Sequence, residues 1–523
     1  MGARTHFKTS FRLCAGRFWP AARRFGLEIA RYSSPSSLRL GVKTVPLGSK
    51  ASFEMSSKKA HFIGIAGKGM SAVALLLRES GWDITGSDEG FYPPVSDYLT
   101  RAGIPFANGY RKENIPADAS LIVIGKNAKL VPETNAEVAA AFASGKPVKS
   151  FPEVIEKLAE ATDNIVVAGS YGKSTSTALL AWCLLRAGKD PSYFIGEITK
   201  GFAAHAHKGG GPTFILEGDE YPSSNWDTAS KFLHYRPCSV LLTSATHDHI
   251  NVYPTHDAYL APFRKLLGIL PNDGLLVLNG SAPYAREIAG AYAGKKVLYA
   301  TPESWHAENV RPGVRTTFDL MNGTVKTTEL TTELLGAHNI ENIVGASALL
   351  LEKNLLTPAE LASGVASFEG VKRRMELLSP RSRVPVLEGF GSSYEKARSA
   401  IDATRLHFPG RRLVIVFEPH TFTWRNRAAL EHYDDVFRGA DSVYIYEPAS
   451  QGAHTHNQLS QEEIVSRVRA SGVAAEPLHN PDDSLRTLGA ALAPDDVVLL
   501  LTSGELGGLI VTLPKLAEEK FPA

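Results

Sequence analysis

Short runs of apolar residues recur along the chain, and most of them end in glycine or polar residues. Such runs, bounded by turn residues, predict strands buried on both faces of a parallel sheet. Stretches with helical spacing lie between them, so the pattern predicts an α/β fold built from doubly wound units. The runs are at residues 60–65, 121–125, 164–168, 214–217, 239–244, 412–417, 442–446 and 495–501.

The alternation of strands and helices divides into three predicted domains behind a basic extension at residues 1–57. A chain of 523 residues has room for about three or four domains. We predict a Rossmann-like nucleotide-binding domain at 58–157 and a central phosphate-loop ATPase domain with a mostly parallel sheet at 158–380. A Rossmann-like C-terminal domain is predicted at 381–523, after the polar, proline-bearing stretch 380–383.

Residues 164–177 combine a β-branched strand, a glycine turn and the start of a helix. This layout gathers backbone N–H groups, a helix N-terminus and the Lys173 ammonium around one point, which suits a polyphosphate. Ser174 offers a hydroxyl to the accompanying Mg²⁺. The usual nucleotide loop has an earlier glycine where this chain has Val167. A Gly-Lys pair in an ordinary turn is therefore the alternative.

A second glycine turn follows the strand at 60–65 and precedes an apolar helix. Gly67 and Gly69 allow a diphosphate to approach the backbone at that helix N-terminus. Asp88 follows about twenty residues later, where an acid can accept hydrogen bonds from a ribose. These residues predict a dinucleotide or a UDP-sugar as ligand, and a tight structural turn is the alternative.

Two later strands end in groups that can bind a metal ion. Glu217 and the acids that follow it lie at the end of the strand at 214–217, and acids beside a phosphate loop suit Mg²⁺. A solvated acidic turn is the alternative. His247 and His249 follow the strand at 239–244 with a spacing that also fits zinc. No further soft ligand has suitable spacing, so we favour one imidazole acting on Mg²⁺ or on substrate.

Composition is that of a globular protein, with 44% hydrophobic and 21% charged residues and no apolar run long enough to span a bilayer. Three cysteines are too few for a disulfide framework or a zinc site, which favours a reducing compartment. Residues 1–54 hold ten Lys or Arg against two Glu, a net charge of +8. Because the whole chain carries +2, the remainder carries −6 and predicts no nucleic-acid partner.

The basic segment at 1–54 has two interpretations. Its Arg- and Ser-rich, acid-poor composition fits an organelle transit peptide. Alternatively, it precedes the true start at Met55, and we favour this second interpretation.

Several segments together resemble those of the Mur ligases, the ATP-dependent amide-forming enzymes of peptidoglycan assembly. They are the phosphate loop 169–175, the acidic segment 217–221, the Asp-His pair 248–249, the His-Asn-x-x-Asn segment 338–342 and the Arg-Met-Glu segment 374–376. The resemblance covers nearly everything after residue 58.

The resemblance implies that ATP and Mg²⁺ activate a carboxylate as an acyl phosphate, which an amine then attacks. It implies that Lys173, Glu217 and His249 are catalytic, with Ser174, Glu217 and His249 as Mg²⁺ ligands. The implied UDP-sugar site is Gly67, Gly69, Met70 and Asp88. The implied ATP site is Gly169, Ser170, Tyr171, Gly172, Lys173, Ser174, Thr175, Asn339, Asn342 and Arg374.

Residues 86–96 and 230–237 resemble the murein peptide ligase branch, which joins L-alanyl-γ-D-glutamyl-meso-diaminopimelate to UDP-N-acetylmuramate. An L-alanine-adding relative is the second hypothesis, and a nucleotide-binding homologue without ligase activity is the third. A dehydrogenase, based on the glycine turn at 64–69, ranks last. We expect a monomer or weak dimer in the bacterial cytoplasm, without a nucleic-acid or membrane partner. If residues 1–54 are part of the translated protein, we expect import into an organelle instead.

The chain departs from the family segments in three places. Ser170 and Tyr171 stand where the phosphate loop usually has Thr and then His or Asn. Thr246 stands where a glutamate would precede the Asp-His pair. In the stretch where the family shows Asp-Asp-Tyr/Phe-Gly/Ala-His-His-Pro, both histidines are replaced, here by Ser392 and Ser393. These changes leave the identity of the amine substrate open.

Overall fold

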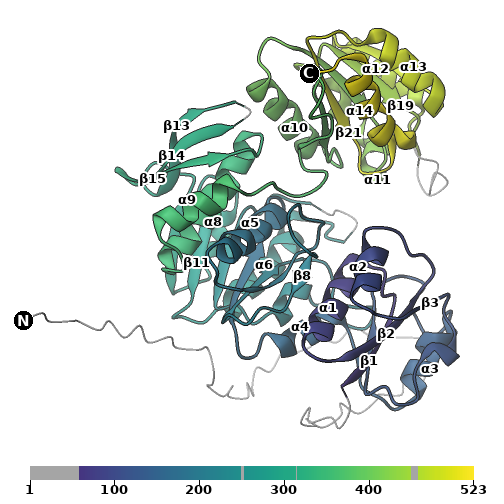
Figure 1. The fold of residues 1–523 in the computed structure, drawn as a ribbon, viewed down its shortest axis with the longest axis vertical. Helices are drawn as coiled ribbons and strands as arrows, with labels where there is room; N and C mark the ends of the chain where they lie inside the picture. Colours follow the sequence, from purple (N-terminus) through teal and green to yellow (C-terminus); the bar gives the residue numbers. More distant parts are fainter. Residues whose placement is uncertain (1–57, 249–251, 314, 449–456) are drawn as a thin grey trace, which may run out of the picture.

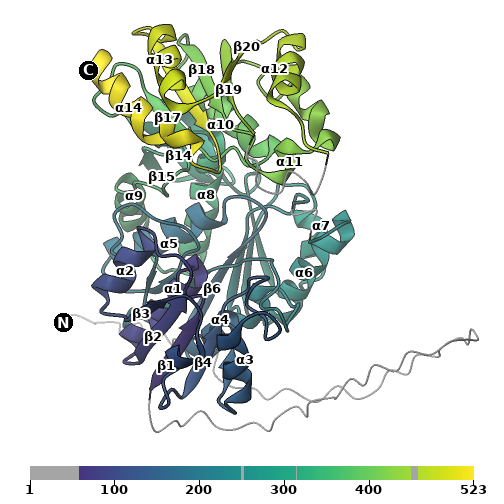
Figure 2. The same ribbon diagram turned by 90° about the vertical axis from the view of Figure 1, so that its right-hand side faces the viewer.

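Three β-sheets, each flanked by helices, form three bodies along the chain (Figures 1 and 2). The computed structural model describes residues 58–248, 252–313, 315–448 and 457–523. The predicted basic extension and His249 lie outside these ranges. Within them, no helix is both long and apolar enough to cross a membrane. The predicted α/β architecture is confirmed.

The first body is a five-stranded parallel sheet in the order β3-β2-β1-β4-β5. Its central strand, β1, lies between β2 and β4, so the strand order reverses there, and ligands of such sheets bind at that point. Its strands are β1 Lys59–Ile63, β2 Asp83–Asp88, β3 Phe106–Asn108, β4 Leu121–Ile124 and β5 Val148–Lys149. Its helices are α1 Lys68–Glu79, α2 Val95–Arg101, α3 Ala136–Ala143 and α4 Phe151–Leu158.

The central body has a ten-stranded sheet in the order β15-β14-β13-β12-β11-β10-β6-β9-β7-β8. The strands from β12 to β7 pair in parallel, whereas β13, β14 and β15 form an antiparallel meander at one end. Its strands are β6 Asp163–Ala168, β7 Ser192–Phe194, β8 Ala206–His207, β9 Thr213–Glu217, β10 Ser239–Leu242, β11 Leu275–Asn279, β12 Lys295–Tyr299, β13 Trp305–Arg311, β14 Thr316–Asn322 and β15 Val325–Thr332. Its helices are α5 Lys173–Arg186, α6 His256–Ile269, α7 Ala285–Ala289, α8 Ala337–Glu352 and α9 Pro358–Ala366.

The last body is a six-stranded sheet in the order β16-β17-β21-β18-β19-β20, parallel except for the β16–β17 pair. It begins with β16, a few residues before the predicted start at 381. Its strands are β16 Glu376–Leu377, β17 Val386–Gly389, β18 Arg412–Phe417, β19 Ser442–Tyr446, β20 Ala474–Leu478 and β21 Asp496–Leu501. Its helices are α10 Tyr394–His407, α11 Phe422–Arg425, α12 Gln461–Ala470, α13 Pro481–Ala491 and α14 Leu509–Lys520.

The position of β6 explains where a site forms in the central body. Its residues from Ile165 to Ala168 are fully buried, because parallel neighbours lie on both edges and helices on both faces. Its neighbours β9 and β10 end at the same edge of the sheet, so Glu217 and Leu242 finish beside the turn into α5. The carboxyl ends of three strands therefore surround the predicted phosphate loop.

Candidate active site

The phosphate loop leaves β6 at Ala168 and enters α5 at Lys173. Gly169 has φ +140° and Gly172 has φ +81°, both in the region that favours glycine. A Cβ at Gly169 would lie 2.3 Å from Thr243 Oγ1, and a Cβ at Gly172 would lie 2.3 Å from Asn342 Oδ1. Backbone conformation and close packing thus both require glycine at these two positions.

The Lys173 ammonium is held in the loop by two oxygens. It donates to the Gly169 carbonyl oxygen at 2.5 Å and lies 3.1 Å from Glu220 Oε2. Burial lowers the pKa of Lys173, but the neighbouring carboxylates of Glu220, Asp219 and Glu217 outweigh burial and leave that pKa raised. The side chain is therefore a cation at the carboxyl edge of the sheet, where a polyphosphate would find a fixed positive charge.

Ser174 and Glu217 provide a pair of oxygens suited to a hard cation. Ser174 Oγ donates to Glu217 Oε1 at 2.7 Å, and the Gly196 N–H donates to Glu217 Oε2 at 2.7 Å. Burial raises the pKa of Glu217. Mg²⁺ is usually bound by one or two protein oxygens together with phosphate and water, so this pair fits it. The predicted third ligand, His249, lies outside the described residues, among which no cluster of three His, Cys, Asp or Glu could hold a metal.

The predicted adenine residues lie on one face of α8. Asn342 Nδ2 donates to Asn339 Oδ1 at 3.2 Å, and Asn339 Nδ2 donates to the Leu335 carbonyl oxygen at 2.8 Å. His338 is beside them, and burial lowers its pKa to about 4, so the imidazole is neutral at pH 7. Glu341, one turn along, accepts a hydrogen bond from Asn279. This face of α8 combines amide, imidazole and carboxyl groups that can form hydrogen bonds with the edge of an adenine base.

Arg374 lies on the connection between the central and last bodies. Its guanidinium carbon is 4.4 Å from the centroid of the Phe390 ring, and its NH2 is 3.8 Å from Glu197 Oε1. Glu197 also pairs at 2.6 Å with Lys68 of the first body. These contacts join all three bodies through charged side chains near the phosphate loop.

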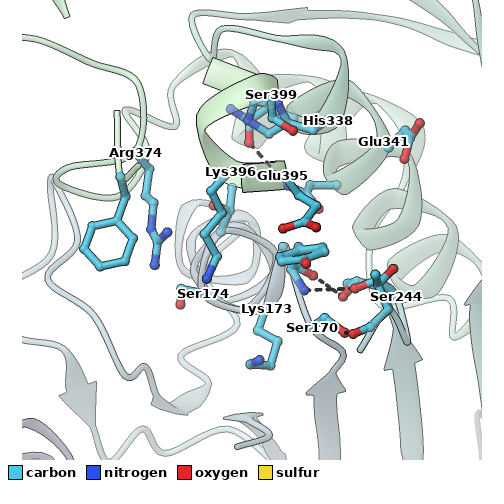
Figure 3. Close-up of a pocket in the computed structure, with 18 of the residues that line it drawn as sticks. Ser170, Lys173, Ser174, Ser244, His338, Glu341, Arg374, Glu395, Lys396 and Ser399 are labelled. Carbon is cyan, nitrogen blue, oxygen red and sulfur yellow. Dashed lines mark hydrogen bonds between the residues drawn. The ribbon is translucent and has the colours of Figure 1, made fainter. Parts of the chain in front are cut away.

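A cavity of about 520 Å³ brings these groups together (Figure 3). Glu217 and every predicted ATP residue except Gly169 line it, and Gly169 contributes the carbonyl that Lys173 contacts. The last body closes one side with Phe390 and residues of α10. Glu341 and Lys396 also line the cavity, although we did not predict them from the sequence. Glu341 falls between the two predicted asparagines, whereas Lys396 belongs to no motif.

The predicted sugar-nucleotide residues lie at the edge of the first sheet, outside the lining of this cavity. Gly67 directly precedes α1, and a Cβ at Gly69 would lie 3.0 Å from the Phe151 ring. Met70 is buried. Asp88 Oδ2 accepts from the Ala66 N–H at 2.9 Å, while Oδ1 accepts from Tyr110 at 3.0 Å. Asp88 therefore supports the glycine turn directly, a role that we did not predict.

The folds of the three bodies and the loop–lysine–carboxylate cavity between two of them are typical of a nucleotide-dependent enzyme. The family model described as "Mur ligase family, catalytic domain" matches residues 59–162, and the "Mur ligase middle domain" model matches 167–350. The chain is 30% identical over 457 residues to the UDP-N-acetylmuramate–L-alanine ligase of Desulfitobacterium hafniense (strain Y51), covering 85% of this chain and 97% of that protein. The chain therefore belongs to the Mur ligase family, whose members are ATP-dependent ligases that form C–N bonds.

Two further comparisons bear on the substrate and the fold. The UDP-N-acetylmuramate–L-alanyl-γ-D-glutamyl-meso-2,6-diaminoheptandioate ligase of Escherichia coli (strain K12) is 27% identical over 458 residues, covering 86% of this chain and 96% of that protein. The crystal structure of UDP-N-acetylmuramate–alanine ligase from Thermotoga maritima superposes with a TM-score of 0.70 at 22% identity, covering 88% of this chain and 98% of that one. The predicted family and fold are confirmed.

Proposed function

We propose that the chain joins the tripeptide L-alanyl-γ-D-glutamyl-meso-diaminopimelate to UDP-N-acetylmuramate, with ATP and Mg²⁺. The observation that carries the ligase proposal is the Lys173 ammonium beside the Ser174–Glu217 pair, in a cavity closed by the last body. The peptide acceptor is supported by residues 86–96 and 230–237, and by the 27% identical E. coli relative.

In the proposed reaction, a lactate carboxylate oxygen of the muramoyl group bonds to the γ-phosphorus while the bond to the β–γ bridging oxygen breaks, releasing ADP. The peptide amine then attacks the acyl carbon, phosphate leaves and the nitrogen loses a proton. The first step brings anions together, so positioning and fixed positive charge account for most of the catalysis. Lys173 holds the β- and γ-phosphates, with Ser174 and Thr175 beside them.

The other predicted residues take the remaining tasks. Asn339 and Asn342 seat the adenine, and Arg374 contacts the nucleotide from the hinge. Mg²⁺, when bound by Ser174, Glu217 and His249, supplies charge neutralisation to the phosphates. The first domain, 58–157, holds the UDP-sugar through Gly67, Gly69, Met70 and Asp88. The last domain, 381–523, holds the amine and excludes water from the acyl phosphate.

L-Alanine as acceptor is the second candidate. The chain is 30% identical to the L-alanine ligase of D. hafniense and 27% identical to the tripeptide ligase of E. coli, and this difference favours L-alanine.

An acceptor screen separates these candidates. The release of ADP that depends on UDP-N-acetylmuramate is measured with L-alanine, the tripeptide and shorter peptides, and kcat/KM is compared. We expect the tripeptide to give the highest value. A higher value for L-alanine would transfer the assignment to the second candidate, and no release with any acceptor would support a nucleotide-binding homologue without ligase activity. The Lys173→Ala variant is the blank for contaminating ATPase.

A further inference from the structure

Two of the three departures from the family segments contact each other in the folded chain, and the third directly precedes a helix that reaches the same cavity. Ser170 Oγ donates to the Thr246 carbonyl oxygen at 2.5 Å, which joins the first departure to the second. Ser392 and Ser393 directly precede α10, and Lys396 in the first turn of this helix lies 5.6 Å from the centroid of the Tyr171 ring. Ser170, Tyr171 and Thr246 therefore line one cavity together with Lys396, which follows the third departure by three residues.

The start of α10 fixes where Lys396 points. Ser393 caps the helix, and its side-chain oxygen accepts from the Lys396 N–H at 3.4 Å. The Lys396 ammonium then lies 3.5 Å from Asp248 Oδ2, across the boundary between the last and central bodies. Figure 3 shows the side chains of Lys396 and Arg374 both directed toward Ser174. The last body thus presents an ammonium to the cavity, just after the segment in which Ser392 and Ser393 replace the family's histidines.

The charges around Lys396 favour an anion between the cations. Burial lowers the pKa of Lys396, and the like charges of Arg374 and Lys173 lower it further, while Asp248 raises it. Three cations from the phosphate loop, the hinge and the last body therefore interact across one cavity. Their mutual repulsion is relieved when a polyphosphate lies among them, and preorganised cations of this kind stabilise a transferring phosphoryl group.

We propose that Lys396 is a catalytic residue that binds the γ-phosphate of ATP during its transfer to the carboxylate. This inference rests on the proposed function. The ammonium keeps its protons throughout, because one P–O bond forms while another breaks and no proton is transferred at this step. Asp248 and the Tyr171 ring hold the ammonium beside the loop before ATP arrives.

Binding of two nucleotides tests the assignment without turnover. The dissociation constants of ADP and of the non-hydrolysable analogue AMP-PNP are measured with Mg²⁺ for wild type, Lys396→Met and Lys515→Met. Lys515 is an exposed lysine of α14 in the same body and serves as the matched control. We expect Lys396→Met to weaken AMP-PNP about 10- to 100-fold, the range for a hydrogen bond between charged groups, and to change ADP less than about twofold. Equal weakening of both nucleotides, or of neither, would overturn the role of Lys396.

Kinetics provide the second measurement. We expect Lys396→Met to lower kcat for ADP release about 100- to 1,000-fold, and Lys396→Arg to recover part of the loss, because the transition state carries the interaction. A raised KM for ATP with unchanged kcat would overturn the catalytic assignment. Wild-type protein that binds neither nucleotide would instead overturn the proposed function, and the role of Lys396 with it. ADP affinity close to that of wild type also shows that the variant is folded.

Discussion

Gly172 closes the phosphate loop in a backbone conformation that other residues rarely adopt, with φ +81° and ψ −12°. Replacing it with alanine places an L residue in the left-handed region, at a cost of about 1 kcal/mol. The new Cβ would also lie 2.3 Å from Asn342 Oδ1, so this buried amide has to move. The movement breaks the hydrogen bond from Asn342 to Asn339, which contributes about 1 kcal/mol. Gly172→Ala is therefore expected to destabilise the native loop by about 2 kcal/mol.

This cost is small against the total stability of a folded domain, but it is concentrated where phosphate binds. If ATP binds only the native loop, the full destabilisation of about 2 kcal/mol weakens ATP binding. We therefore expect the dissociation constant of ATP to rise about 30-fold. Isothermal titration calorimetry measures this constant directly. Urea unfolding of the same samples is expected to show a loss of similar size.

Gly188→Ala is the matched control for the cost of placing alanine in the left-handed backbone region. Gly188 follows α5 with φ +69°, and a Cβ there meets nothing within 4 Å. This variant is expected to lose about 1 kcal/mol of stability from the backbone conformation and to bind ATP like wild type. If Gly172→Ala and Gly188→Ala bound ATP equally well, the argument from the Asn342 contact would be refuted.

Three further outcomes follow from the geometry. Lys173→Ala is expected to lower ADP formation about 1,000-fold or more while leaving UDP-sugar binding intact, and turnover like wild type would exclude the phosphate-loop assignment. Asp88→Asn is expected to raise the dissociation constant of UDP-N-acetylmuramate about tenfold without affecting ATP, whereas Asp83→Asn, exposed on the same strand, is expected to change neither. His407 accepts from the Gly336 N–H at 2.7 Å only as neutral imidazole, and burial lowers its pKa. The hydrogen bond to His407 therefore stabilises the fold fully above a pH of about 6.5, and this stabilisation is lost as the pH falls below that value. The free energy of unfolding in urea is therefore expected to fall less in acid for His407→Leu than for wild type.

The parts of the fold that could be predicted from sequence are those with local causes. The buried strands are continuous apolar runs because they pair on both edges and are covered on both faces, as β6 is. The phosphate loop could equally be predicted from the sequence, since its glycines, lysine and hydroxyl are adjacent in the chain. The prediction of 239–244 as a strand was slightly too long, because the strand ends at Leu242 and its polar neighbours Thr243 and Ser244 turn to support the loop.

Other features could not be predicted because their causes are non-local. The meander β13–β15 has no long apolar run, since much of β15 is exposed at the edge of the sheet. The insertion of β6 between β9 and β10 is a property of the whole sheet. Lys396 acquires its position from packing between two bodies, and nothing in the neighbouring sequence marks it. The ribose-facing role of Asp88 stays a prediction, and only the structure shows that Asp88 supports the glycine turn.

The contacts among the departures bear on whether the chain is a ligase or a nucleotide-binding homologue that has lost activity. Here the hydroxyl of Ser170 is bound between the Thr246 carbonyl and the hydroxyl of Tyr259, and the ring of Tyr171 lies under the Lys396 ammonium. Ser392 instead contacts its own body, where its carbonyl oxygen accepts from the Thr421 hydroxyl. The replaced residues thus leave the Lys173 and Lys396 ammonium groups at the cavity, and retained cations favour the ligase over a homologue that has lost phosphate chemistry.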